Sequence, residues 1–135
     1  MVTAVSELKA IQEHAESIKS DATHELTVMS VGDAWAQGDV LITCLDRVPD
    51  GCEPMQAERQ LAPGTTQGSR HCIVDLAGVE MFRMKDATPL DGPVFRCDRK
   101  VEIDHPEHGN LIVPAGVYGV TYQRQYAEEL RRVQD

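Results

Sequence analysis

The sequence has few aromatic residues, little positive charge and no long hydrophobic run. Only 4% of its 135 residues are aromatic, and 13 Lys and Arg stand against 22 Asp and Glu, so the formal net charge is −9. Proteins that bind nucleic-acid phosphates or anionic membranes need a positive contact surface, which disfavours both kinds of partner. No apolar run approaches the ~20 residues that a membrane-spanning helix needs. We therefore expect a soluble protein that contacts neither nucleic acid nor membrane directly.

Common catalytic and export signatures are also missing. The sequence has no GxSxG, GxxxxGK[ST] or GxGxxG motif, and its N-terminus lacks the basic and apolar regions of a signal peptide. We expect a cytoplasmic protein in which the four cysteines, none of them in a CxxC pair, are free thiols. The length fits one domain.

Apolar residues recur at helical spacing near the N-terminus and predict an amphipathic helix over residues 3–19. The stripe consists of Ala4, Leu8, Ile11, Ala15 and Ile18. It packs either on its own domain or on a partner or second subunit. The run QYAEELRRVQ predicts a short second helix over 125–133, since its glutamates precede its arginines in the favourable order. The expected organisation is an N-terminal helix, 1–22, and a single β domain, 23–135.

Short β-branched runs separated by Gly, Pro and Asp follow from Leu26 onward. They are ELTVMSV, DVLITCL, HCIVDL, VEMFRM, PVFRC, KVEID, LIVP and GVYGVTYQ. Each has the length and composition of a strand, and no stretch between them is long enough for a crossover helix, which predicts antiparallel pairing. We expect a mainly β fold, a small antiparallel β-barrel or sandwich with a cupin-like barrel as one option, flanked by the two helices.

Segment 53–70, EPMQAERQLAPGTTQGSR, is polar and nearly free of β-branched aliphatic residues. A loop of this length inside a compact domain is often functional. It is either a lid or partner-binding loop, or an ordinary exposed connection.

Histidines are the residues with the most suggestive chemistry. Imidazole is a common ligand of Zn, Fe, Ni and Cu, and two histidines with a carboxylate can bind a metal while leaving open positions. His105, Glu107 and His108 supply that set, although Pro106 restricts the backbone, and the run DHPEHG also reads as plain turn chemistry. We keep both interpretations: a simple turn, or a divalent metal site formed by His71, His105 and His108.

The segments GTTQGSRHCIVDLAG and GNLIVPAGVYG resemble the two characteristic segments of cupins, small β-barrels that often hold a metal. The turn residues of the second cupin segment are present as Gly109, Pro114 and Gly116. Of the histidine ligands only His71 is matched, because Ser69 and Gly119 stand where cupins have histidines. The resemblance implies a barrel and does not carry the cupin metal site over.

A longer run, HPEHGNLIVPAGVYGVTYQRQY, with QGDVLI and LAPGTTQGSRH upstream, is similar to an uncharacterised family of small bacterial and phage-associated β-rich proteins. That family has an HPEHG segment, a PxGxY turn and an RQxY ending. The similarity covers about two thirds of the chain, from Gly38 onward. It implies no activity, only that residues 105–126 form one unit of the fold.

The few aromatic residues mark candidate partner contacts. Trp35 precedes the most apolar run and is either a core residue or an interface residue. Tyr118, Tyr122 and Tyr126 recur at even intervals, so on a strand they share one face, which is either half-buried sheet or a protein interface.

These patterns favour a binding or structural module over an enzyme. We expect it to self-associate as a homo-oligomer or dock a protein partner, with no catalytic residue and no obligatory cofactor. The partner-binding candidates are Leu8, Ile11, Ile18, Trp35, Tyr118, Tyr122 and Tyr126. One alternative is a cupin-like metal-dependent enzyme that uses His71, His105 and His108. A second is an acidic mimic of nucleic acid, although the carboxylates are spread along the chain.

Overall fold

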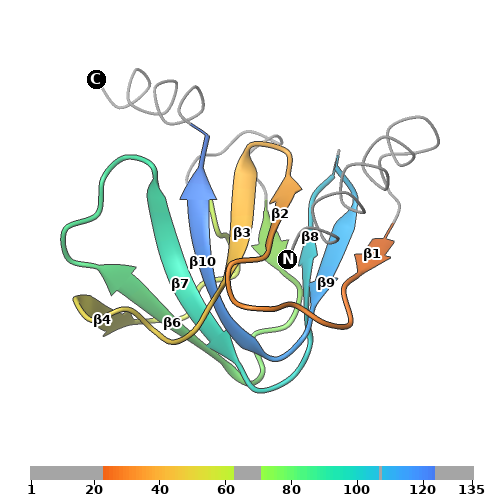
Figure 1. Cartoon of the computed structure of the whole chain (residues 1–135). Coiled ribbons are helices and arrows are strands. Elements are labelled where there is room, and N and C mark those ends of the chain that lie inside the picture. The colour runs from red at the N-terminus through yellow and green to blue at the C-terminus, as the bar shows by residue number, and fades with distance from the viewer. Residues whose placement is uncertain (1–22, 63–70, 107, 124–135) are drawn as a thin grey trace.

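The computed structural model describes residues 23–62, 71–106 and 108–123, which form ten strands in two sheets (Figure 1). The six-stranded sheet has, in spatial order, β2 (Ala34–Gln37), β3 (Val40–Leu45), β10 (Gly116–Tyr122), β7 (Asp91–Cys97), β6 (Val79–Met84) and β4 (Cys52–Met55). The four-stranded sheet has β1 (Thr23–Glu25), β9 (Asn110–Val113), β8 (Val101–Asp104) and β5 (Cys72–Ile73).

The predicted mainly β class is confirmed, with two sheets rather than a closed barrel in the described chain. Neighbouring strands pair antiparallel, as expected, except that β1 runs parallel to β9. The predicted helices at 3–19 and 125–133 lie outside the described residues.

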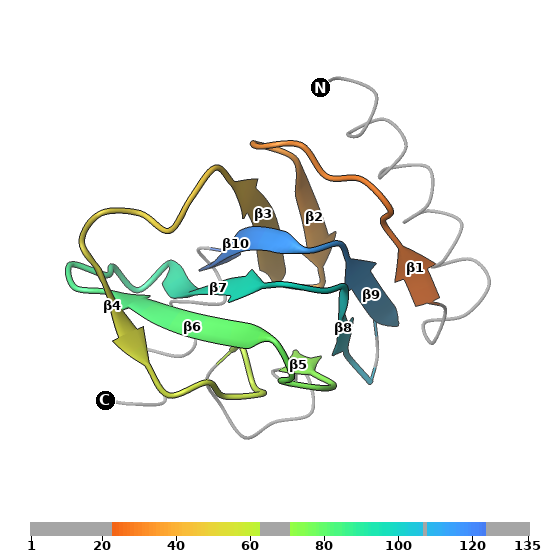
Figure 2. The same cartoon turned by 90° about the horizontal axis from the view of Figure 1, so that it is seen from below.

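Both sheets contribute side chains to one core. Along β3, buried Val40, Ile42 and Cys44 alternate with more exposed residues, because successive side chains of a strand point to opposite faces. Strand register continues this pattern across the sheet in one row, Cys44, Tyr118, Phe95, Met81 and Met55. The four-stranded sheet adds Ile73, Ile103, Leu111 and Val113. Figure 1 and Figure 2 show β8 and β9 beside β2, while β4 and β6 lie at the other side.

Seven of the predicted runs contain strands, and two strands were not predicted. β2 has the sequence AWAQ and lacks β-branched residues, while β4, CEPM, contains Pro54 and pairs only with β6. Proline lacks the donor that a central strand needs, so it is accepted at this edge. The strand predicted for ELTVMSV is wrong beyond its first residue: Val28 and Val31 are 75% and 63% exposed in an irregular segment.

Segment 53–70 is not one long loop. After β4, the backbone N–H of Leu61 donates to the carbonyl of His71 at 2.7 Å, and the N–H of Ile73 donates to the carbonyl of Arg59 at 2.7 Å. Leu61 and Ala62 are buried. Residues 53–55 therefore belong to β4 and pair with β6, residues 59–61 pair with residues 71–73, and residues 63–70 lie outside the described chain.

Candidate functional site

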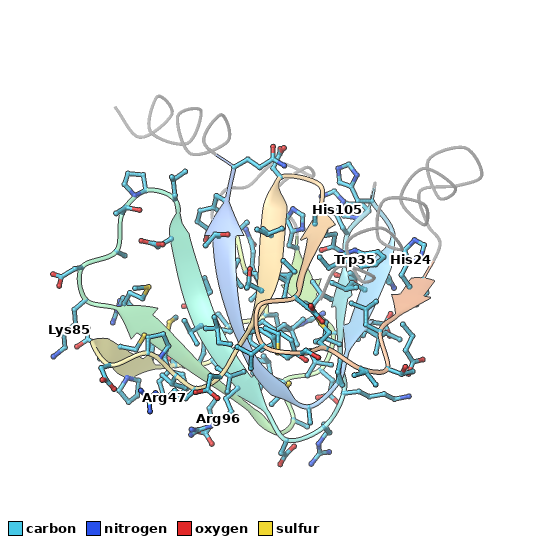
Figure 3. All side chains as sticks on the ribbon, viewed as in Figure 1. His24, Trp35, Arg47, Lys85, Arg96 and His105 are labelled. Carbon is cyan, nitrogen blue, oxygen red and sulfur yellow. The ribbon has the colours of Figure 1, made fainter. Side chains whose placement is uncertain are left out.

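Three histidines predicted as one site lie together at one end of the two sheets; we call His71, His105 and His108 the imidazole cluster. Cys72 pairs with Asp104 in antiparallel strands, so the residues just outside that pair, His71 and His105, face each other. The ring centroids of His71 and His105 are 4.3 Å apart, and those of His105 and His108 are 4.5 Å apart. Figure 3 shows His105 near the end of β2.

Gln37, the last residue of β2, orients the innermost ring. Its amide nitrogen donates to the carbonyls of Ile103 at 3.1 Å and Gly109 at 2.8 Å. Its Oε1 lies 2.9 Å from Nδ1 of His71, and because an amide oxygen only accepts, Nδ1 carries the proton. Nε2 of His71 is therefore left with a lone pair.

That lone pair is buried. His71 is fully buried, and its Nε2 has no hydrogen-bond partner among the described residues. Burial, followed by the neighbouring His105 and His108, lowers the pKa of His71 from its usual 6.5 to about 3. The ring is therefore neutral near pH 7 and offers an acceptor or metal-ligating nitrogen whose desolvation is not offset by a hydrogen bond.

His105 and His108 are held differently. The backbone N–H of His108 donates to Nδ1 of His105 at 3.0 Å, which places the proton of a neutral His105 on Nε2. His105 is buried and His108 is exposed, so the cluster runs from the core to the surface. Gly38, at φ +58°, makes room for His108: a Cβ there would lie 2.5 Å from Cδ2 of the imidazole.

One imidazole of the cluster has its ligating nitrogen fixed by a neighbouring side chain. Gln37 fixes the lone pair of His71 on Nε2 by accepting from Nδ1, as second-shell partners do for the histidine ligands of metal sites. In the described ranges, no group of three or more His, Cys, Asp or Glu side chains is arranged to hold a metal ion.

A second candidate site is a cavity of about 420 Å³, which we call the methionine-lined pocket. Its lining is Met55, Glu58, Gln60, Leu61, Ala62, Met81, Arg83, Met84, Ala87, Asp91, Gly92, Pro93 and Tyr122. One wall comes from β4, β6, β7 and β10, and the other from the segment after β4. The hydroxyl of Tyr122 donates to the carbonyl of Leu61 at 2.9 Å and joins these walls. Gly92 accommodates this tyrosine, since a Cβ there would lie 2.8 Å from its hydroxyl.

The described partner-binding candidates are largely inside. Trp35 is 3% exposed, and its ring centroid lies 5.5 Å from that of His24 (Figure 3). Tyr118 is 1% exposed, and its hydroxyl donates to the carbonyl of Pro114 at 2.6 Å. Tyr122 is partly buried in the pocket wall. The remaining candidates, outside the described residues, are Leu8, Ile11, Ile18 and Tyr126.

Sequence reasoning missed Gln37 and the methionine-lined pocket. The only local signal for Gln37 is its position two residues after Trp35, on the same inward face of a strand. Nothing in the spacing of Met55, Met81 and Met84 indicates that they meet, because their proximity comes from the pairing of β4 with β6.

The fold and the two sites define a two-sheet β domain with an imidazole cluster that runs from the core to the surface and a separate, mainly apolar pocket. The chain belongs to the family described as Domain of unknown function (DUF8820), which matches residues 36–123. This match supports the expected membership of an uncharacterised family, and the matched range contains both sites. No curated protein and no solved structure matches the chain significantly. No helix in the described residues is long and apolar enough to cross a membrane.

Proposed function

We propose that this domain is a binding module and that the methionine-lined pocket holds a small organic ligand. The observation that carries the proposal is the cavity itself, whose volume of about 420 Å³ lies in the range of small-molecule sites. Its walls are mainly apolar with a few polar groups, which is the usual composition of such sites. Met55, Met81 and Met84 add flexible, polarisable side chains that adapt to a bound molecule.

The lining is poor in catalytic side chains, which supports binding over catalysis. Among these described residues there is no histidine, cysteine, serine or lysine, and the candidate bases are the carboxylates of Glu58 and Asp91. The hydroxyl of Tyr122 already donates a hydrogen bond to the carbonyl of Leu61.

The test is a titration of methionine-methyl-labelled protein with hexan-1-ol, followed by NMR. We expect saturable shifts of the methyl signals of Met55, Met81 and Met84. Met29 packs against the core outside the pocket and serves as the internal control. Equal shifts of Met29, or no saturable shift, would reject the pocket as a binding site.

Binding of a second copy of the chain is a further part of the proposal. It is supported by Val28 and Val31, which are strongly exposed between β1 and β2. Val28→Lys with Val31→Lys should then lower the mass measured by light scattering without altering the β signal in circular dichroism. A native protein that is already monomeric would contradict this.

A metal-dependent enzyme that uses the imidazole cluster is the alternative function, favoured by the buried lone pair on Nε2 of His71. A divalent ion there would supply Lewis-acid chemistry, with His105 and His108 nearest to complete its ligands. Metal analysis of protein purified without a histidine tag tests it. Stoichiometric Zn, Fe, Ni or Mn would support the enzyme, whereas no metal and no gain in melting temperature on metal addition would reject it.

The remaining expectations have narrower support. The four free cysteines support a cytoplasmic location. The acidic-mimic alternative rests on the net charge of −9 alone.

A further inference from the structure

We infer that the ligand of the methionine-lined pocket is a small apolar amine, an organic molecule with an apolar body and one positive charge. The inference rests on the proposed function and adds the chemical class of the ligand. It follows from the charged side chains of the lining, which are Glu58, Arg83 and Asp91.

Arg83, the one cation among the described lining residues, is paired with an acid outside the lining. Nε of Arg83 lies 3.6 Å from Oε1 of Glu53 on the paired strand β4. An anionic ligand would therefore compete with Glu53 for Arg83, and that competition weakens selection for anions.

Within the described chain, neither acid of the lining forms an ion pair with a cationic side chain. Asp91 accepts through Oδ2 from the backbone N–H of Thr88 at 2.9 Å and from its hydroxyl at 3.0 Å, and Oδ1 takes part in neither bond. Glu58 is exposed on the opposite wall. Among the described residues at the pocket, with Glu53 counted, three carboxylates stand against one guanidinium, so their summed charge is negative.

The apolar part of the lining suits the rest of an amine. The thioethers of Met55, Met81 and Met84 provide adaptable contacts for an apolar body. The ring of Tyr122 lies in the same lining, and an aromatic face attracts a cation. The net charge of −9 for the whole chain also attracts cations from solution.

The experiment compares hexylamine, hexan-1-ol and hexanoate, which share one apolar body and differ in charge. At pH 7.5 the amine is protonated and the acid is ionised. Dissociation constants come from the methionine methyl shifts of the full chain at low salt. We expect hexylamine to bind more tightly than hexan-1-ol, and hexan-1-ol more tightly than hexanoate.

Two matched variants locate the charge preference. Glu58→Gln should weaken hexylamine binding by about two- to fivefold, the effect of one partly solvated ion pair, and leave hexan-1-ol unchanged. Arg83→Gln should change the affinity for hexylamine in the opposite direction and strengthen its binding. Both side chains are exposed, so both variants are expected to fold.

The outcomes separate the inference from the proposed function. If none of the three probes shifts the pocket methyls, the proposed function fails and the inference fails with it. If hexan-1-ol or hexanoate binds as tightly as hexylamine, or Glu58→Gln leaves hexylamine binding unchanged, the pocket stands and the amine assignment is overturned.

Discussion

Gln37 accepts a hydrogen bond at 2.9 Å from Nδ1 of His71, a residue 34 positions further along the chain. The same amide donates to carbonyls of Ile103 and Gly109, so one side chain at the end of β2 connects the six-stranded sheet to three segments around the four-stranded sheet. The hydrogen bond to His71 sets the tautomer of its ring, and the bonds of Gln37 together link the two sheets at this end of the core.

Replacing Gln37 tests the importance of that connection. Gln37→Leu fills the same space with an apolar side chain but leaves the N–H of His71 and the two carbonyls without their hydrogen-bond partner. Since each buried unsatisfied group costs about 1–3 kcal/mol, we expect the free energy of unfolding to fall by about 3 kcal/mol. Urea unfolding at pH 7.5 measures it. Gln56→Leu, at an exposed position, is the control and should change stability by less than about 0.5 kcal/mol. Equal effects would contradict the role of Gln37.

The buried His71 predicts a dependence of stability on pH. Its pKa is about 3 in the folded protein and about 6.5 unfolded, so between these values the unfolded state binds the extra proton. Stability therefore falls as the pH decreases below about 6.5, by up to about 1.4 kcal/mol per pH unit. Burial also lowers the pKa of His24, which adds a contribution of the same sign.

Urea unfolding at pH 7.5, 6.5 and 5.5 measures this loss in a window where ordinary carboxylates hardly titrate. In the same window the ring signals of His71 in NMR spectra of the folded protein should not shift. A His71 titration midpoint near 6.5 would contradict the buried, neutral ring.

Gly38 predicts a steric effect on the imidazole cluster. A Cβ at this position would lie 2.5 Å from Cδ2 and 2.7 Å from Nε2 of His108, so Gly38→Ala must displace that ring. Gly51→Ala is the matched control, because Gly51 also has positive φ, +92°, and no atom of the described residues lies within 4 Å of its Cβ position. Both variants should lose about 1 kcal/mol of stability to backbone strain. Only Gly38→Ala should shift the ring signals of His108, and unchanged signals would show that the close approach is wrong.

Two tyrosines of β10 form a natural pair for testing the pocket wall. Tyr118→Phe and Tyr122→Phe each remove one hydroxyl that donates to a backbone carbonyl, of Pro114 and Leu61 respectively. Each should cost about 1 kcal/mol of stability in urea unfolding. Only Tyr122→Phe releases the wall at Leu61 and should weaken binding of hexan-1-ol. If the two variants bind hexan-1-ol equally well, the hydrogen bond between Tyr122 and Leu61 does not support the ligand site.

Local patterns in the sequence predicted most of the sheet and little of the sites. Val40, Ile42 and Cys44 alternate within six residues, so β3 can be recognised without its neighbours. β2 lacks that signal because its burial comes from pairing with β3 and packing in the core. Gln37 reaches carbonyls 66 and 72 positions away, a relationship that only the strand order creates.

The histidines were recognised by their chemistry, yet their geometry could not be predicted. His71 and His105 face each other because β5 pairs with β8. The tautomer of His71 depends on Gln37, 34 positions earlier, whereas that of His105 depends on the backbone N–H of His108 in the same turn. The methionine-lined pocket could not be predicted from the sequence for the same reason, because Met55 lies beside Met81 only through the pairing of β4 with β6.

The central claim is that the pocket between β4, β6, β7 and the segment after β4 holds a ligand. Intermolecular nuclear Overhauser effects between bound hexylamine and the methionine methyl groups test it most directly. We predict contacts from the alkyl chain to Met55, Met81 and Met84 and none to Met29. Contacts to Met29 alone, or to the exposed Val28 and Val31 without the pocket methionines, would contradict the claim.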